Sequence, residues 1–336
     1  MVQSRWDHIN RNENLLTCWS AILLDGHFVL EHSARSQSGR IFNFNGTAGV
    51  WRIDAILDAG GWEHDTITED LDLSYRAAMK GWEFVYLPNN VAPAELPATI
   101  KSFTSQQKRW AQGTMQVAKK LFVPLWKSNV SWKAKLEGSI HFTNNVAYPL
   151  TALLIVLMPL TAPFRDFSWI DGLVFLCTCL SIMGFYAVAL WKIDLLRKNW
   201  WHILPTLALG VGMTFRQSLA VFQGLFGADR HFVRTPKKGN SEAYQIAKYM
   251  SALKMDQFFY ISIAEITFAT YCMVQVMSLY EQGLYGTIPF LILFSFGFYF
   301  VGMLNIWEQV GPFVLQRVKL KKTQEATVNF DKNLPK

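Results

Sequence analysis

Cysteine and charge are both scarce in this sequence, and each shortage restricts the class of protein to which it belongs. Of the four cysteines, Cys18 stands apart and the other three lie in apolar stretches, namely Cys177, Cys179 and Cys272. No spacing of cysteine and histidine matches a zinc site, so we expect buried, reduced, unpaired thiols. Residues 1–6 lack the apolar segment of a secretory signal peptide, and we expect none there. Charged residues make up only 17% of the chain against 51% hydrophobic residues, a balance outside the usual globular range.

Hydrophobic and aromatic residues are abundant instead, and the excess is concentrated after about residue 140. The 13 tryptophans and 25 phenylalanines suit a membrane interface, where aromatic rings are favoured. A length of 336 residues allows about two domains. We therefore expect an α/β domain at 1–134, a helical integral membrane domain at 135–315 and a basic cytoplasmic tail at 316–336. Four stretches are long and apolar enough to cross a bilayer: 144–163, 170–191, 258–280 and 284–306.

The positive charges flank these apolar stretches, and this distribution favours a membrane protein over a nucleic-acid-binding one. The net charge is +7, with Lys and Arg dense at 192–257 and in the tail, whereas the loop at 164–169 contains only Arg165. Under the positive-inside rule, residues 1–143, 192–257 and the tail are cytoplasmic. The α/β domain would then face the cytoplasm from the inner or plasma membrane.

A fifth apolar stretch, 202–226, contains Pro205, Arg216 and Gln217. If it crossed the membrane, the two halves of the basic segment would lie on opposite sides. We therefore expect an interfacial helix that lies in the inner leaflet.

The first part of the chain alternates between helix and strand signals. Gly60 and Gly61 predict the end of a short helix, and Thr66 with Glu69 three residues later predicts a capping box at the start of another. The predicted order begins with a helix at 10–35, and within 40–51 a strand, a tight loop and then another strand or helix start. It continues with a helix at 52–59, a helix at 66–80, a strand at 82–87, a loop at 88–97 and a long amphipathic helix at 99–122.

Three carboxylates are packed into four residues at the start of the predicted 66–80 helix. Acids at a helix start complement its dipole, and this structural role suffices for Glu69 and Asp72. Asp72 also has Arg76 four residues on, which predicts a surface ion pair. Asp70 is the candidate for chemistry, because a glycine-rich loop precedes it and an aromatic, cationic helix follows.

That following helix carries Gln106, Arg109 and Trp110 at positions i, i+3 and i+4, hence on one face. A tryptophan offers a flat apolar platform for a sugar ring, and an arginine pairs with phosphate. The alternative is an amphipathic helix anchored by its tryptophan at the membrane interface. Glu265, inside a predicted span, faces either a cavity or a partner on a neighbouring helix, and the sequence leaves both open.

Taken together, these motifs resemble the processive family 2 glycosyltransferases, which include cellulose synthases and cellulose-synthase-like glucan and mannan synthases. The resemblance covers about residues 1–310. It rests on Thr68-Glu69-Asp70 followed about 35 residues later by Gln106-Gln107-Lys108-Arg109-Trp110 and then by membrane spans. The run Asn45-Gly46-Thr47-Ala48-Gly49-Val50-Trp51 resembles the bacterial relatives of plant mannan and glucomannan synthases most.

The resemblance implies a GT-A-type catalytic domain that transfers sugar from a nucleotide sugar, of the UDP-glucose or GDP-mannose type, onto a polysaccharide acceptor with inversion. It implies that Asp70 is the catalytic base. It also implies substrate-binding roles for Thr68, Glu69, Gln106, Arg109, Trp110, Asn45, Gly46 and Thr47. Phe232, Thr235 and Lys237 resemble a gating loop within 228–241, where Arg234 replaces a valine of the family pattern; without the resemblance, this basic segment is an ordinary positive-inside flank.

The family's donor half, with its D-x-D motif, is not recognisable in residues 1–65, where the aspartates are isolated. We therefore expect a C-terminal portion of the enzyme that holds the acceptor site and channel. By itself, this portion should neither bind nucleotide sugar properly nor turn over. The resemblance implies a divalent metal (Mg or Mn), whose ligands we expect upstream, with no metal ligand in this chain. The expected partners are the nucleotide sugar, the polysaccharide, the bilayer and other synthase subunits, with no nucleic acid. A non-catalytic membrane subunit of a polysaccharide synthase is the alternative. A small-solute transporter is disfavoured, because only four spans are clear.

Overall fold

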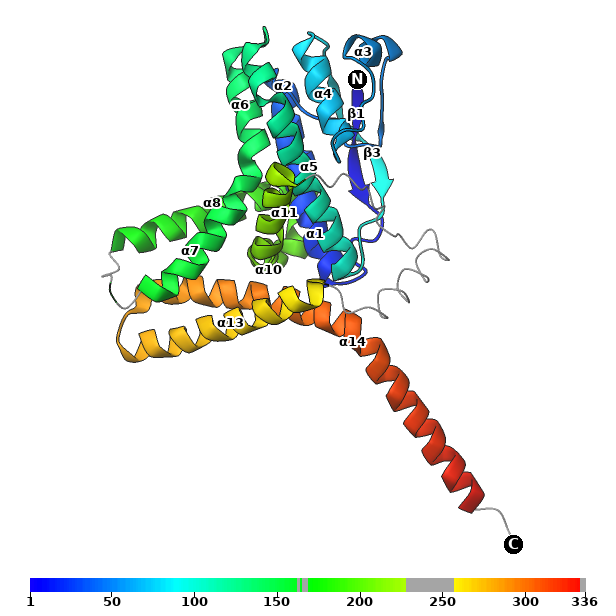
Figure 1. Ribbon diagram of the computed structural model, residues 1–336, viewed down its shortest axis with the longest axis vertical. Coiled ribbons are helices and arrows are strands. Elements are labelled where there is room, and N and C mark those ends of the chain that lie inside the picture. The colour runs from blue at the N-terminus through cyan, green and yellow to red at the C-terminus, as the bar shows by residue number, and fades with distance from the viewer. Residues whose placement is uncertain (162–163, 165–168, 228–256, 333–336) are drawn as a thin grey trace.

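We describe the protein from a computed structural model that covers residues 1–161, 164, 169–227 and 257–332. A mixed α/β part lies at one end, and long apolar helices extend sideways from its base (Figure 1). This confirms the expected fold class of an α/β region followed by helices that could cross a membrane. The N-terminus lies in the α/β part, and the C-terminus lies at the far end of α14 (Ile288–Lys332).

The sheet is small and is built on the first strand of the chain, which the sequence patterns did not predict. β1 (Val2–His8) lies between β2 (Gly49–Val50), which is antiparallel to it, and β3 (Val85–Ala94), which is parallel. The segment at 40–48, for which we expected a strand and a tight loop, has no regular structure, and the second strand or helix start expected after it corresponds to β2. Phe42 and Phe44 fill a core beside the sheet, whereas Ile41 packs in a separate core with the helices that follow.

β3 corrects the predicted strand at 82–87 and loop at 88–97. The strand runs on to Ala94 although it contains Pro88 and Pro93. Proline is tolerated because β3 pairs with β1 alone and lies at the sheet edge, so one side of the strand needs no donors. The register shifts between Ser4 and Arg5, next to Pro88. The Pro88 carbonyl accepts a hydrogen bond from Arg5 Nε at 2.9 Å.

The helix predicted at 10–35 begins later, at Leu15. Asn14 caps α1 (Leu15–Asp25) in a reciprocal pair with Thr17, with the Thr17 amide donating to Asn14 Oδ1 at 2.9 Å. The helix continues through a π-helical turn, Gly26–Glu31, into α2 (His32–Gln37). A buried ion pair joins the C-terminal end of α1 to the loop before it, since Arg11 donates to both oxygens of Asp25 at 2.7 and 2.8 Å.

The helix that carries the carboxylates starts three residues after the predicted cap. α3 (Ile53–Asp58) ends at two positive-φ glycines, Gly60 and Gly61, as predicted. α4 (Glu69–Met79) then has Thr68 at its N-cap, so the capping box of Thr66 and Glu69 was wrong. The loop before it is held instead from another helix, because the Ile67 amide donates to Gln116 Oε1 at 2.9 Å.

α5 (Ile100–Lys127) is the central helix of the molecule and is longer than predicted. It lies between α4, α6 (Trp132–Thr143) and α11 (Thr214–Phe226). Its C-terminal half shares a core with α4 and α6, in which the buried Tyr75 hydroxyl lies 2.8 Å from His141 Nδ1. Its N-terminal half shares a second core with α1 and the membrane helices: Ile100, Phe103, Trp19, Leu190, Leu209 and Val301.

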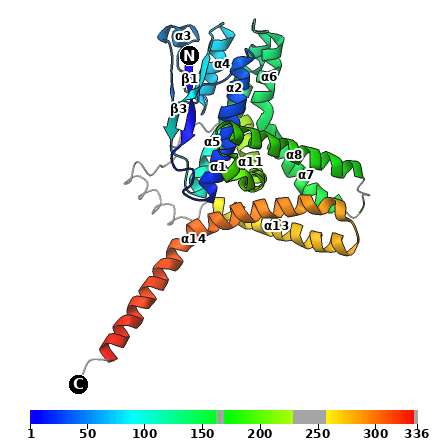
Figure 2. The ribbon, with the colours of Figure 1, turned by 180° about the vertical axis from the view of Figure 1, so that it is seen from behind.

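Four helical segments are long and apolar enough to cross a membrane, by length and composition. They are Trp132–Met158, Trp169–Lys192, Phe259–Glu281 and Tyr285–Gly311. The first combines α6 with α7 (Ala147–Thr161), and the others correspond to α8 (Trp169–Lys192), α13 (Gln257–Glu281) and the start of α14. Figure 2 shows α8 and the α13–α14 hairpin from behind.

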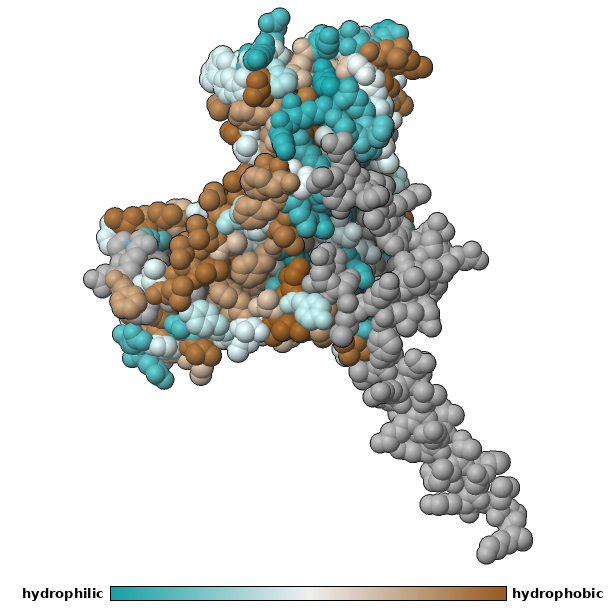
Figure 3. Space-filling model, viewed as in Figure 1, coloured by the Kyte–Doolittle hydropathy of each residue, from teal (hydrophilic) through white to brown (hydrophobic). Residues whose placement is uncertain are grey.

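The surface of this helical block is hydrophobic, whereas the α/β part is largely hydrophilic (Figure 3). Large apolar side chains are exposed along α7 and α8, among them Leu150, Leu153, Leu157, Val174 and Leu180. Such a surface is unusual in contact with water and suits lipid.

Residues 202–226 form two helices rather than one. α10 (Ile203–Gly212) and α11 meet at Met213. α10 packs so closely on α14 that a Cβ on Gly212 would lie 2.3 Å from the Gly297 carbonyl oxygen. Neither helix is among the four apolar segments that could cross a membrane. Their position at the interface stays a prediction.

Candidate active site

Asp70 lies in the first turn of α4 and faces the loop of residues 45–48. It is half-buried, and Gly46 approaches it so closely that a Cβ there would lie 3.2 Å from Asp70 Oδ2. Gly46 has a φ of +73°, which other residues rarely adopt. The site therefore needs glycine at position 46 for both backbone conformation and space.

The environment raises the pKa of Asp70 to about 7. Burial is the largest cause, because a charged carboxylate loses solvation there. The Leu71 amide, which donates to Asp70 Oδ1 at 2.8 Å, lowers the pKa. The neighbouring charge of Glu69 raises it, and Arg109 lowers it by a smaller amount. A carboxyl group with a pKa near neutrality is suited to accept a proton at physiological pH.

A fully buried amide on β1 shapes the loop that faces Asp70. Gln3 Nε2 donates to the carbonyls of Thr47 and Ala48, each at 3.1 Å, and Gln3 Oε1 accepts from the Asn45 amide at 3.2 Å. Ser74 fixes the loop to the helix of Asp70, since its hydroxyl accepts from the Phe44 amide at 2.9 Å and donates to the Asp70 carbonyl at 2.6 Å. The loop and the helix that carries Asp70 are thus held by the same hydrogen-bond network.

Asn45 uses its side chain within the protein rather than toward the site. Its Oδ1 accepts from Asn43 Nδ2 at 3.1 Å, and its Nδ2 lies 3.1 Å from His32 Nε2. His32 is fully buried among aromatic rings, and burial holds the pKa of its imidazole well below the usual value. Thr47 and Gly46, by contrast, are exposed and remain the loop positions that a ligand can reach.

α5 packs closely against the start of α4, and the contact occurs at a glycine of α5. A Cβ on Gly113 would lie 2.5 Å from Thr68 Cγ2 and 2.6 Å from Thr68 Oγ1. Gln106, Arg109 and Trp110 precede Gly113 by seven, four and three residues, so all four share one face of α5. Arg109 and Trp110 are half-buried there and Gln106 is buried. Burial lowers the pKa of Arg109, and the charges of Glu69 and Asp70 oppose this shift.

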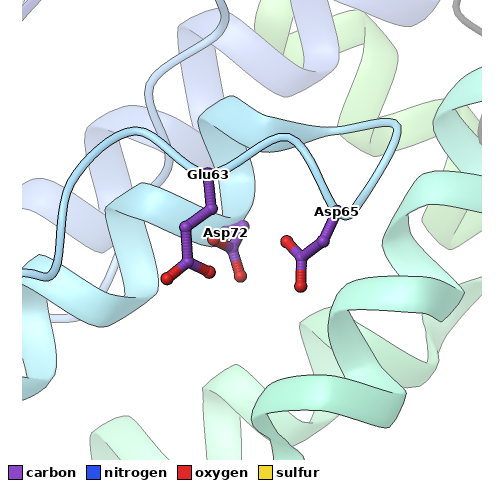
Figure 4. A group of neighbouring side chains, drawn as sticks. All are labelled: Glu63, Asp65 and Asp72. Atoms are coloured by element: carbon purple, nitrogen blue, oxygen red, sulfur yellow. The ribbon is translucent and has the colours of Figure 1, made fainter.

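Asp72, two residues after Asp70, points to the other side of α4 into a cluster of three acids with Glu63 and Asp65 (Figure 4). It is fully buried, so the predicted surface pair is in fact a buried one, with Arg76 Nε donating to Asp72 Oδ2 at 2.8 Å. The Lys120 ammonium sits within the cluster, 2.8 Å from Asp65 and 3.0 Å from Asp72, and contacts Glu63 as well.

The chemistry of this cluster does not fit the expected divalent metal. Oxygen ligands suit Mg²⁺ or Mn²⁺, but an ammonium already neutralises these carboxylates from their centre. The cluster also lies on the opposite side of α4 from Asp70, since two residues of helix turn by about 200°. Among the residues that the structure describes, it is the one group of three acids, histidines or cysteines close enough to share an ion. We derive no catalytic step from it.

The gating-loop residues Phe232, Thr235 and Lys237 lie outside the described residues. Three residues that hold the site together escaped the sequence patterns: Gln3, Ser74 and Gly113. Gln3 and Ser74 act at a distance in sequence, on positions 42 and 30 residues away. Gly113 carries a recognisable signal, a glycine one turn after Trp110 within a long helix, where glycine lowers helix stability without a packing reason.

Known proteins share sequence similarity with this chain. Residues 6–215 match the family model described as Glycosyl transferase family group 2. Three similar proteins are from Oryza sativa subsp. japonica. Probable glucomannan 4-beta-mannosyltransferase 4 is 37% identical over 192 residues, 55% of this chain and 35% of the relative. Probable glucomannan 4-beta-mannosyltransferase 3 is 33% identical over 256 residues, 71% of this chain and 44% of the relative. Probable glucomannan 4-beta-mannosyltransferase 6 is 46% identical over 143 residues, 43% of this chain and 24% of the relative.

In each case the chain spans less than half the length of the relative that it matches. The matched segment of the family model includes the Asp70 helix, the loop at 45–48 and the α5 face with Gln106, Arg109 and Trp110. The chain therefore belongs to glycosyl transferase family group 2.

Proposed function

We propose that this chain forms the acceptor side and the membrane side of an inverting glycosyltransferase that extends a β-linked polysaccharide. The observation that carries this proposal is Asp70, a half-buried carboxyl group with a pKa raised to about 7. Gly46 of the exposed loop approaches this carboxyl group, and α5, which carries Arg109 and Trp110, packs against the start of its helix at Thr68. Because the related proteins are named as mannosyltransferases, we propose a mannosyl donor of the GDP-mannose type in preference to UDP-glucose.

In the proposed reaction, Asp70 accepts the proton of an acceptor hydroxyl as its oxygen forms a bond to the anomeric carbon of the donor. The bond from that carbon to the diphosphate oxygen breaks, and its electron pair leaves with the diphosphate. A single displacement inverts the configuration and converts an α-linked donor into a β-linkage. Arg109 pairs with the departing diphosphate, for which a guanidinium is well suited. Trp110 and Gln106 hold the terminal sugars of the acceptor.

The apolar helices fit a product that leaves through a membrane. The core around Ile100 and Phe103 connects the start of α5 directly to α8, α10 and α14, so the helix that carries Gln106, Arg109 and Trp110 begins against the helical block. We propose that the α/β part faces the cytoplasm and that the helices, with the segment at 228–241, guide the growing chain across the bilayer. Further synthase subunits are compatible partners.

A chimaera tests the proposal in a protein of the relatives' length. The matched segment of one of the three rice relatives is replaced by this chain. Membranes that contain the chimaera are assayed for incorporation of labelled mannose from GDP-mannose into material that β-mannanase digests. We expect Asp70→Asn to lower incorporation by about 10²- to 10⁴-fold, the usual contribution of a general base.

The matched control is Asp54→Asn, which makes the same change at an exposed carboxylate in the first turn of α3 and should leave incorporation unchanged. If incorporation survives in Asp70→Asn, the base assignment is wrong and the chain fits a non-catalytic membrane subunit better. A chimaera that inserts and folds but incorporates no sugar with Asp70 intact also contradicts the proposal.

A further inference from the structure

The helix that carries Gln106, Arg109 and Trp110 is capped by a residue from the other end of the chain. The backbone amides of Ile100 and Lys101, the first two residues of α5, donate to Glu308 Oε1 and Oε2 at 2.7 and 3.2 Å. Glu308 lies on α14, more than 200 residues later in the sequence. The backbone amide of Ser102, the third residue of α5, donates to the Thr99 side chain at 3.2 Å.

α5 has no acidic residue of its own in its first turn, although such a residue would stabilise the positive end of the helix dipole. Glu308 supplies that charge from the membrane part. A carboxylate that receives two amides with separate oxygens fixes both the distance and the rotation of α5 relative to α14. The contact is therefore a geometric constraint as well as a cap.

α14 is itself tied to its neighbours on the same face. Asn305, one helical turn before Glu308, donates to Ser262 Oγ on α13 at 2.7 Å. The same hydroxyl accepts from Arg216 on α11 at 2.7 Å. α11 then returns to α5, where a Cβ on Gly224 would lie 2.5 Å from the Gln112 carbonyl oxygen. α5 is thus held by α14 at its start and by α11 near its middle.

We propose that Glu308 is a positioning residue: it fixes α5 against the membrane helix α14, and thereby fixes the Gln106–Trp110 face relative to Asp70. Gln106 lies about 9 Å along the helix axis from Ile100, close enough to the contact that a rigid helix transmits its orientation. The effect of this position on sugar transfer rests on the proposed function, but the contact between Glu308 and α5 does not.

The alternative is that Glu308 only stabilises the start of α5 and does not determine its position. One substitution distinguishes these two roles. Ser102→Glu completes the Thr-x-x-Glu capping box that begins at Thr99, and returns an acid to the first turn of α5. It restores the stability of the helix start without restoring the link to α14. Combined with Glu308→Ala, it should recover thermal stability but not helix position.

The test measures position directly and needs no catalysis. Spin labels are placed on cysteines introduced at the exposed positions Val123 on α5 and Met303 on α14, in the full chain in lipid nanodiscs with the four native cysteines replaced by alanine. Pulsed electron paramagnetic resonance reports the distribution of distances between them. We expect one narrow distribution for the parent, and at least twofold broadening for Glu308→Ala with or without Ser102→Glu.

Glu308→Gln retains one carbonyl acceptor and should broaden the distribution less, which provides a milder variant if Glu308→Ala does not fold. Glu281→Gln, at the exposed end of α13, is the control and should leave the distribution narrow. An unchanged distribution in Glu308→Ala, or a narrow one restored by Ser102→Glu, overturns the proposal. Because the readout is independent of sugar transfer, a chimaera without activity would contradict the proposed function alone.

Discussion

Two carboxylates only two residues apart on α4 have different environments because the helix turns between them. Asp72 is fully buried and is held by Arg76 and Lys120. Asp70 faces Gly46 and the exposed part of the loop, and the positive charge of Arg109 affects its pKa less than burial does. A proton acceptor needs a side chain that a hydroxyl can reach, so the geometry favours Asp70.

The raised pKa of Asp70 gives the reaction a defined pH dependence. The base works in its ionised form, so kcat/KM of the chimaera should fall about tenfold for each pH unit below about 7 and level off above it. Initial rates of mannose incorporation at subsaturating donor, measured from mildly acidic to mildly alkaline pH, check this. The Asp54→Asn protein should give the same profile, and a flat profile through this range would contradict the assignment.

The raised pKa of Asp70 also predicts how the stability of the folded protein depends on pH, and this dependence differs from that of activity. The folded-state pKa of this acid lies above its ordinary value of 3.8, so the folded state binds more protons than the unfolded state between about 4 and about 7. The contribution of this group to stability is therefore present at low pH and is lost as the pH rises through about 7. Asp70→Asn should match the parent in melting temperature at acidic pH and exceed it at neutral pH, while activity is lost.

Residues of the candidate site that lie in short motifs could be proposed from the sequence, whereas the residues that hydrogen-bond around them could not. Asp70, Arg109 and Trp110 lie in short motifs whose residue types indicate a base, an anion partner and a stacking surface. Gln3 and Ser74 are ordinary polar residues, and their role arises only when β1 and α4 are brought to the same loop. No local sequence pattern predicts these tertiary contacts.

At the scale of the elements, helices were predicted better than strands. Apolar periodicity indicated the helices that became α1, α4 and α5, with errors of several residues at their ends. The predicted cap at Thr66 failed because Gln116 of α5 holds this loop instead, which is a tertiary interaction. The start of β3 lies within the predicted strand at 82–87, but its continuation to Ala94 was predicted as a loop, because prolines indicate a loop unless the strand is known to lie at an edge.

The close contact of α4 and α5 predicts that Gly113→Ala is damaging although alanine favours helices. The added methyl group would lie 2.5 Å from Thr68 Cγ2, and Thr68 is short and β-branched, so the helices must separate. We expect a loss of about 1–3 kcal/mol of stability, typical of overpacking, together with reduced mannose incorporation by the chimaera. Thermal or denaturant unfolding measures the first quantity.

Two comparisons make this prediction specific. Gly210→Ala, at a helix position where nothing lies within 4 Å, should be neutral or stabilising by up to about 1 kcal/mol. Thr68→Ser removes the methyl group that clashes, so the double variant with Gly113→Ala should recover part of the lost stability. If Gly113→Ala and Gly210→Ala behave alike, the close packing of α4 on α5 is wrong.

At the scale of the whole molecule, hydropathy indicated how many apolar segments there are but not how they contact the α/β part. Glu265 illustrates the limit, since the sequence left open whether it faces a cavity or a partner. In the structure it pairs with Arg216, whose Nε and Nη2 donate to its two oxygens at 2.8 Å each. Both side chains are almost fully buried, at 3% and 0% exposure, so this bidentate pair holds α11 to α13.

This pair predicts a non-additive response to mutation. Removal of one partner leaves an uncompensated buried charge, so Arg216→Met alone should cost about 3–5 kcal/mol, and Glu265→Met alone a similar amount. Replacement of both by methionine removes both charges, so the double variant should be more stable than either single one. Thermal unfolding in detergent micelles measures all three, with Glu281→Gln as the control for loss of an exposed carboxylate on the same helix. Additive losses would mean that Arg216 and Glu265 do not interact, and the α11–α13 contact would then have to depend on apolar packing alone.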